Sequence, residues 1–396
     1  MSVVPRGRLD LTKLGRKSFL TASALSNLLQ EIAEQDASFD PGPSSQQSIK
    51  RARVRSLNDT DSPHGPMMQE WNVAMSDGSI QTISFMNPAT FLWESCRRSS
   101  KFREFLKARL EACPPSLERP WDLIWYNDEV SPGNQLAPTN RRKLQAVYYS
   151  FKQFGPEYLC QERSWFVLTA CRSIVVQGMD AGMSQLTRLA MGSFMRFARG
   201  VVLPVGGDVF GVLVSKISLL VADEAALKAM LGNKGASGKL LCVLCRNTVQ
   251  KRYAETLSGN LVYHTETDAA KFLIHSRASL LQCVGYLQEQ QSKLGANAFA
   301  ELQTALGINY FENGLLRDAK LMAEVDVCKA LMYDWMHVFL VSGLFHKEMT
   351  LLLPLLRRSG ITADMIHEFV SAFTWPLWTS TKGCTAGSLF FIQEIR

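Results

Sequence analysis

The stretch that decides the fold is LLVADEAALKAMLGNKGASGKLLCVLC, residues 219–245. An apolar run of strand character ends at the acidic pair Asp223 and Glu224, and a short helical segment follows. A glycine-rich turn then leads to a Cys-x-x-Cys pair, Cys242 and Cys245. Carboxylates and closely spaced thiols are both metal-binding groups, so this stretch predicts a metal-dependent site.

Length and composition describe a globular protein. The 396 residues are enough for two or three domains, or for one large domain with insertions. A net charge of +7 is compatible with a polyanionic partner but does not require one. The nine cysteines are irregularly spaced with one close pair, which favours a reduced intracellular protein over a disulfide framework.

We expect no membrane span. No segment reaches about 18 uninterrupted apolar residues, and the best candidate, Val201–Ala222, contains Asp208 and Lys216. The N-terminus has basic residues but neither the apolar core nor the cleavage site of a secretion signal. The expected location is the nucleus, with the cytoplasm as the alternative and an organellar transit peptide left open.

Residues 1–68 are predicted to form a flexible basic arm and linker. Apolar side chains recur at helical spacing from Phe19 to Ile32, which predicts a short amphipathic helix, whereas residues 36–66 are rich in Ser, Pro, Gly, Gln and Asp. The run KRARVR (50–55) within them is either a nuclear-import or phosphate-contacting patch or simply solvated. Its candidate nucleic-acid contacts are Lys50, Arg51 and Arg53.

Residues 69–120 are predicted to hold a hairpin and a basic helix. The hairpin is centred on the Ser-Asp-Gly turn at 76–78, between two runs of strand character. Six basic residues against one acid lie between 97 and 109, together with an apolar face. Such a helix either follows a DNA backbone or presents a charged outer face while packing on the core.

Two acids end strand-like runs far apart in the sequence. The run Trp121–Tyr126 is followed by Asp128, two further strand-like runs and a helical stretch at 183–199 come next, and the run 209–222 ends at Asp223. This is the element order of a ribonuclease-H-like α/β fold, in which the first and fourth strands lie side by side. Asp128 and Asp223 would then meet although 95 residues separate them. Two such carboxylates suit a pair of Mg²⁺ or Mn²⁺ ions, although a single acid at a strand end is more often a helix N-cap.

The residues around both acids resemble a known family. The segments DEVSPGNQL…NRRK…AVYYSF (128–151) and ADEAALKAMLGNKGASGKLLCVLCRN (222–247), followed by YDWMH (333–337), are similar to the transposases of CACTA-type (En/Spm-like) DNA transposons. The similarity covers roughly residues 120–345. The resemblance implies a ribonuclease-H-like core, DNA as the partner and two-metal phosphodiester chemistry. Self-association is left open.

The resemblance also implies roles for particular residues. It makes Asp128 and Asp223 the first two catalytic acids and expects a third on a later helix, for which Glu368 is the candidate and Glu394 the alternative. It makes Cys242 and Cys245 half of a structural Zn²⁺ site, with His337 as third ligand and His264, His275 or Asp334 left open as the fourth. The basic residues of the resembling segment that are candidates for nucleic-acid contact are Arg141, Arg142 and Lys143.

The predicted organisation is therefore a core that begins at residues 121–231, a helical insertion with the thiol pair at 232–332, and a C-terminal helical part at 333–396 that we expect to be truncated. The predicted activity is metal-dependent DNA cleavage and strand transfer. The alternative is an inactive, transposon-derived, zinc-containing protein that binds nucleic acid or a partner. A third possibility is a structural protein with a stray thiol pair. The glycine run GNKGASGK does not meet the P-loop pattern, because position 240 is Leu.

Overall fold

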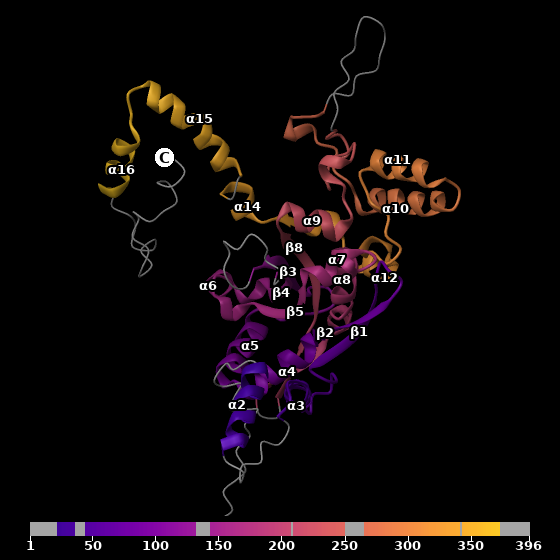
Figure 1. Cartoon of the computed structure of the whole chain (residues 1–396), viewed down its shortest axis with the longest axis vertical. Coiled ribbons are helices and arrows are strands. Elements are labelled where there is room, and N and C mark those ends of the chain that lie inside the picture. Colours follow the sequence, from indigo (N-terminus) through magenta and orange to yellow (C-terminus); the bar gives the residue numbers. More distant parts are fainter. Residues whose placement is uncertain are drawn as a thin grey trace, which may run out of the picture. The chain divides into compact units, whose positions relative to one another are not determined.

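The computed structural model describes residues 22–35, 44–131, 143–206, 209–249, 265–340 and 343–372. They fall into two compact units, with the boundary between Met332 and Tyr333. The first unit is a mixed α/β structure organised around one central sheet (Figure 1). This confirms the α/β class expected from the sequence.

The central sheet has five strands in the order β5-β4-β3-β8-β9. Their bounds are β3 (Trp121–Val130), β4 (Leu144–Phe151), β5 (Phe166–Arg172), β8 (Ser215–Ala222) and β9 (Leu331–Tyr333). The pairs β3–β4 and β4–β5 are antiparallel, and β3–β8 is parallel. The predicted meander and the predicted neighbourhood of the two acid-bearing strands are therefore confirmed. The three-residue strand β9 was not predicted, because it is too short to show a period.

A bulge sets the register between β3 and β8. Leu123 pairs with Ile217, an offset of 94 residues, and Ile124 pairs with Leu219, an offset of 95. The extra residue is Ser218, whose Oγ donates to Asp122 Oδ1 at 2.7 Å. Bulges of this kind redirect the side chains that follow them, and here the change shifts every later residue of β8 by one position against β3.

One face of the sheet carries the core. Trp125 on β3 and Tyr149 on β4 are register partners and are both fully buried. The ring of Phe194 meets both edge-on, at centroid distances of 6.4 Å and 4.9 Å. Phe194 follows helix α8 (Gly182–Gly192), which buries Leu186 and Ala190, one turn apart. This packing fixes the position of β3 and hence of the acid near its end.

The region expected to be one strand at 209–222 is two strands in different sheets. Strand β7 (Val209–Leu213) forms a separate antiparallel pair with β6 (Val201–Gly206), and β8 begins after Val214. The predicted hairpin at 69–84 is confirmed as β1 (Met68–Ala74) and β2 (Ile80–Met86). The predicted basic helix is two helices, α4 (Pro88–Arg98) and α5 (Ser100–Ala112), because Ser99 is the N-cap of α5 and its side chain accepts a hydrogen bond from the amide of Phe102 at 3.2 Å.

The basic run at 50–55 does not lie in a linker. It belongs to helix α3 (Gln46–Asn58), which packs against α2 (Ala22–Gln35) through a buried cluster of Ala22, Leu25, Leu29 and Ile49. Composition suggested a linker because α3 offers little apolar surface apart from Ile49, but that side chain is fully buried. The predicted helix at 19–32 is confirmed from Ala22 onward, and residues 1–21 lie outside the described part.

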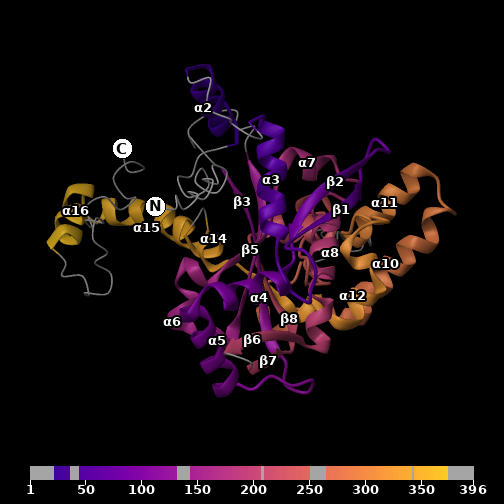
Figure 2. The same cartoon turned by 90° about the horizontal axis from the view of Figure 1, so that it is seen from below.

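The insertion is only partly helical. Helix α9 (Glu224–Leu231) precedes the predicted insertion, and the helices within it are α10 (Arg277–Gln291), α11 (Ala296–Leu306), α12 (Ala319–Glu324) and α13 (Val327–Ala330). Helices α10 and α11 form a hairpin, drawn in orange in Figure 2. The described residues between α9 and α10 form turns and isolated bridges, because Cys, Gly and Asn interrupt any helical period there.

The second unit contains α14 (Trp335–Phe339), α15 (Leu344–Arg358) and α16 (Ala363–Ala372). Its apolar side chains include Leu351 and Phe369, which are 72% and 71% exposed. The segment Trp335–Arg358 is long and apolar enough to cross a membrane by length and composition alone. Length and composition do not overturn the expectation of no span, because the core helix of a water-soluble protein passes the same test.

Candidate functional site

The two predicted acids follow neighbouring positions of parallel strands. Tyr126 on β3 pairs with Val221 on β8. Asp128 comes two residues later on β3, and Asp223 comes two residues later directly after the end of β8, so continuing the register of the two strands aligns them. Both are half-buried. Neighbouring strands lie about 4.8 Å apart, so this placement suits two carboxylates that share a cation.

Asp223 also has a structural role. It is the N-cap of α9, and its Oδ1 accepts a hydrogen bond from the amide of Ala226 at 2.6 Å. Glu224 is in the first turn of the helix and pairs with Lys228 at 2.8 Å. The capping function that any acid at a strand end can have is therefore realised here. A carboxylate has two oxygens and about four lone-pair positions, so capping through Oδ1 does not prevent metal binding.

The charge of Asp128 acts on an aromatic neighbour. Burial raises the pKa of the Tyr148 phenol, and the negative charge of Asp128 raises it further. Tyr148 is the register partner of Tyr126, two residues from the row of the acids. The carboxylate of Asp128 is thus close enough to Tyr148 to act on it electrostatically.

The next acid, Glu129, belongs to a different set of contacts. Its carboxylate accepts hydrogen bonds from Lys143 Nζ at 2.6 Å and Ser173 Oγ at 2.9 Å. Burial raises the pKa of Glu129, but the hydrogen bonds of Lys143, Ser173 and Gln145 and the charge of Lys143 outweigh it, so that the pKa is lowered. Lys143, a predicted nucleic-acid contact, is therefore held in an ion pair.

The predicted third acid belongs to the other unit. Glu368 lies on α16 in the second unit, where it is exposed. Within the described residues, no group of three or more His, Cys, Asp or Glu side chains is arranged to hold a metal ion. Glu394, Arg141, Arg142 and His264 lie outside the described part of the chain.

The thiol pair lies in a small knuckle. Leu240 and Val249 form a bridge, and the amide of Leu244 donates to Cys242 Sγ at 3.3 Å. An amide pointing at the first sulfur stabilises negative charge there. Cys245 is buried, and burial raises the pKa of its thiol to about 11, with a further increase from Cys242. Without a cation nearby, the Cys245 sulfur therefore favours the protonated form.

The segment beside the knuckle contains a histidine. Cys245 forms a bridge with Ile274, and the amide of His275 donates to the carbonyl of Leu244 at 2.7 Å. The ring Nδ1 of His275 is 3.0 Å from Ser279 Oγ. Burial lowers the pKa of His275, and the charge of Arg246 lowers it further. A buried, neutral imidazole beside two thiols is suitable for zinc, although the three side chains do not converge as a ligand set.

The predicted third zinc ligand, His337, lies in the second unit. Asp334 is the N-cap of α14 and accepts from the amide of Met336 at 2.9 Å through Oδ1. Its Oδ2 is 2.7 Å from His337 Nδ1. A carboxylate that holds Nδ1 orients the imidazole and directs Nε2 outward, which is the usual arrangement behind a metal-binding histidine. Asp334 therefore fits the role of an orienting group better than that of a fourth ligand.

Some of the basic side chains predicted to contact nucleic acid are exposed, and others are buried or held in contacts within the protein. Lys50 and Arg51 on α3 are exposed, whereas Arg53 is half-buried. On α4 and α5 several basic side chains are bound within the protein, as expected for helices that pack on the core. Arg98 pairs with the buried Glu94 at 2.7 Å, and Arg109 donates to the carbonyl of Phe154.

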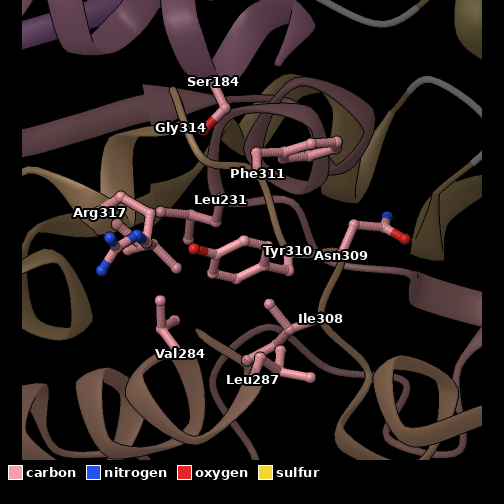
Figure 3. A pocket seen from close by; sticks show the side chains of 11 residues that line it. Ser184, Leu231, Val284, Leu287, Ile308, Asn309, Tyr310, Phe311, Gly314 and Arg317 are labelled. Carbon is pink, nitrogen blue, oxygen red and sulfur yellow. The ribbon is translucent and has the colours of Figure 1, made fainter. Parts of the chain in front are cut away.

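A small cavity lies where the segment 308–317 meets the neighbouring helices (Figure 3). It lies between α8, α9 and α10, and the ring of Tyr310 points into it near Arg317. The cavity of about 10 Å³ has room for about one water molecule and no substrate. The amide of Leu315 donates to Ser184 Oγ on α8 at 2.8 Å nearby. The contact is thus a packing joint that positions the insertion.

A scan against models of known protein families finds no match for this chain, and a search among curated proteins finds none either. The assignment of the site therefore depends on the geometry and chemistry of its residues alone. Sequence reasoning missed the bulge at Ser218 and the rings of Tyr126, Tyr148 and Trp165 on the face of the acids, and it named His275 only as an open candidate for the fourth zinc ligand. Only the rings of Tyr126 and Tyr148 had a signal in the sequence, in the alternation of Trp121–Tyr126 and the run AVYYSF.

Proposed function

We propose that this protein is transposase-like and cleaves and joins DNA strands with the help of divalent cations. The observation that supports the proposal is that Asp128 on β3 and Asp223, directly after β8, each follow the register partners Tyr126 and Val221 by two residues. The strand order β5-β4-β3-β8-β9, antiparallel from β3 to β5 and parallel between β3 and β8, is the order of a ribonuclease-H-like sheet and supports the proposed fold.

The residues fit Mg²⁺ or Mn²⁺, because both acids offer hard oxygen ligands from a rigid sheet edge. Bound there, the ions would activate a water or a DNA 3′-hydroxyl and stabilise the leaving oxygen of the phosphodiester. Asp128 and Asp223 would hold the ions, and the N-terminus of α9 would fix the orientation of Asp223 through its cap. Glu368 remains the proposed third acid.

A structural zinc site belongs to the same proposal. Cys242 and Cys245 would supply two thiolates, and Zn²⁺ would lower their pKa enough to deprotonate them. The orientation of His337 by Asp334 supports it as a ligand, and the contact of His275 with the knuckle makes that residue the second candidate. DNA as the partner favours a nuclear location, with the cytoplasm as the alternative. The proposal includes self-association and no membrane partner.

A second candidate function is favoured by one observation. No third acid joins Asp128 and Asp223 among the described residues, and Asp223 has a capping role that would preserve it without catalysis. The chain would then be a zinc-containing, nucleic-acid-binding protein that retains the fold without the reaction.

The test is nicking of supercoiled plasmid DNA with Mg²⁺ or Mn²⁺. Asp128→Asn and Asp223→Asn remove one charge each while keeping shape, and we expect each to lower the nicking rate by at least about a hundredfold, because the chemistry depends on ion geometry. Asp318→Asn is the matched control, since Asp318 caps α12 in the same manner, accepting from Leu321 at 3.0 Å. Nicking that survives both site variants overturns the assignment, and a parent protein that binds DNA but never nicks it favours the second candidate.

A further inference from the structure

The face of the sheet that carries the acids also carries a group of aromatic rings. Tyr126 on β3 and Tyr148 on β4 are register partners, with ring centroids 6.1 Å apart and planes 38° from parallel. The ring of Trp165 meets Tyr126 edge-on at 6.0 Å. The indole Nε1 of Trp165 donates to the carbonyl of Leu159 at 2.9 Å, which holds the ring in place. We call these three rings the aromatic row.

The aromatic row is accessible, unlike the rings on the opposite face. All three rings are half-buried, and Val167, the register partner of Tyr148 on β5, is 42% exposed. On the opposite face the corresponding rings of Trp125 and Tyr149 are fully buried. Aromatic surface beside a polar site, held on strands and left partly open, is a feature of ligand-binding surfaces more than of cores.

The aromatic row is next to the acids. Tyr126 precedes Asp128 by two residues on one strand, which is about 7 Å at the rise of an extended chain. The charge of Asp128 acts on Tyr148, so the phenol and the carboxylate are near one another. A phosphate held at the acids through cations would place the base of a neighbouring nucleotide over these rings.

We propose that Tyr126, Tyr148 and Trp165 stack an unpaired DNA base beside the phosphate that is cut. This inference rests on the proposed function, because it uses Asp128 and Asp223 to locate the phosphate. The occupant is an unpaired base and not a duplex, because a ring can stack only on a base whose face is open. The rings carry no charge, so they add affinity without adding salt dependence.

The experiment measures binding of a fluorescent single-stranded thymidine 20-mer by anisotropy, with Ca²⁺ present so that hard-cation sites are filled. Tyr148→Phe keeps the ring, and Tyr148→Leu removes it while leaving an apolar side chain. We expect Tyr148→Phe to bind as the parent does and Tyr148→Leu to bind about tenfold more weakly, since a stacked base contributes roughly that much affinity or more. Tyr286→Leu, at a residue on α10 that is 47% exposed, is the matched control and should bind as the parent does.

A second measurement does not depend on any variant. An oligonucleotide with 2-aminopurine should lose fluorescence when it binds the unaltered protein, because stacking on the rings quenches it. Equal binding by the parent and Tyr148→Leu overturns the inference, and so does unquenched 2-aminopurine in the complex. If the parent protein does not nick DNA while Tyr148→Leu still binds the oligonucleotide more weakly, the proposed reaction fails and the base-stacking site stands. If Asp128→Asn abolishes nicking while Tyr148→Leu binds as the parent does, the proposed reaction stands and the base-stacking site fails.

Discussion

Tyr126 on β3 and Val221 on β8 are register partners, and Asp128 and Asp223 follow them by two residues each. The register depends on Ser218. Before the bulge the strands pair with an offset of 94 residues, and only the offset of 95 after it aligns the two acids. Without the extra residue Asp128 would lie in the row of Ala222, and Asp223 would fall outside it.

The first prediction concerns the bulge. Ser218→Ala removes the hydrogen bond to Asp122 Oδ1, and we expect nicking to slow by about tenfold, because small displacements of catalytic groups are costly. Initial nicking rates under Mg²⁺ give the measurement. Ser116→Ala is the control, since its hydroxyl donates to an exposed acid, Glu118, at 2.8 Å. If the two variants nick DNA equally fast, Ser218 does not maintain the register.

The second prediction separates the two roles of Asp223. Asparagine caps helices about as well as aspartate, whereas alanine costs roughly 1 kcal/mol of stability. We therefore expect Asp223→Asn to unfold at the same denaturant concentration as the parent and Asp223→Ala to unfold at a lower one, while both nick DNA at least about a hundredfold more slowly than the parent. Urea unfolding followed by circular dichroism measures the first part. An Asp223→Asn protein that nicks normally would show that capping is the whole role of this residue.

The third prediction concerns zinc. The purified protein should contain about one Zn²⁺ per chain, and Cys242→Ser and Cys245→Ser should each lose it, because thiolates provide half of a tetrahedral site. Metal content by mass spectrometry is the measurement, with the exposed Cys160→Ser as the control. Comparing His275→Asn with His337→Asn identifies the third ligand. A parent protein without bound zinc would show that the thiol pair is part of the turn and does not bind a metal.

The sequence was sufficient for the class of the fold and for the row of acids, since both depend on strand-length apolar runs that end in polar residues. It was insufficient where single contacts decide. Ile49 turns a polar stretch into a packed helix, and Ser99 divides one helical pattern into two. Ser218 shifts a register that periodicity leaves undefined, because an extra residue in a strand leaves no mark on composition.

Candidate ligands were predictable by type but not by position. The thiol pair is recognisable from its spacing, whereas the neighbour of the thiols depends on a bridge between Cys245 and Ile274. The helix of Glu368 formed as predicted, but spacing along the chain does not determine which distant acid joins Asp128 and Asp223. Such long-range pairing follows from packing, which the local sequence pattern does not encode.

The fourth prediction is a pH dependence of stability. Burial raises the pKa of the Cys96 thiol from 9.0 to about 12, although the charge of Arg103 opposes it. Below pH 9 the thiol is protonated in both states. As the pH rises from about 9 toward 12, the unfolded chain loses the proton while the folded protein keeps it, so the free energy of unfolding falls. Urea unfolding between pH 8 and 10.5 should show this fall, less steeply in Cys96→Ala than in the control Cys113→Ala. Equal slopes would show that Cys96 titrates alike in both states.

The most direct measurement of the central claim is Mn²⁺ binding followed by electron paramagnetic resonance. If Asp128 and Asp223 share a cation site, the parent protein binds Mn²⁺, and Asp128→Asn and Asp223→Asn each weaken that binding by at least about tenfold, because each removes a charged oxygen ligand. Asp318→Asn should bind as the parent does. Undiminished Mn²⁺ binding in both site variants would contradict the account.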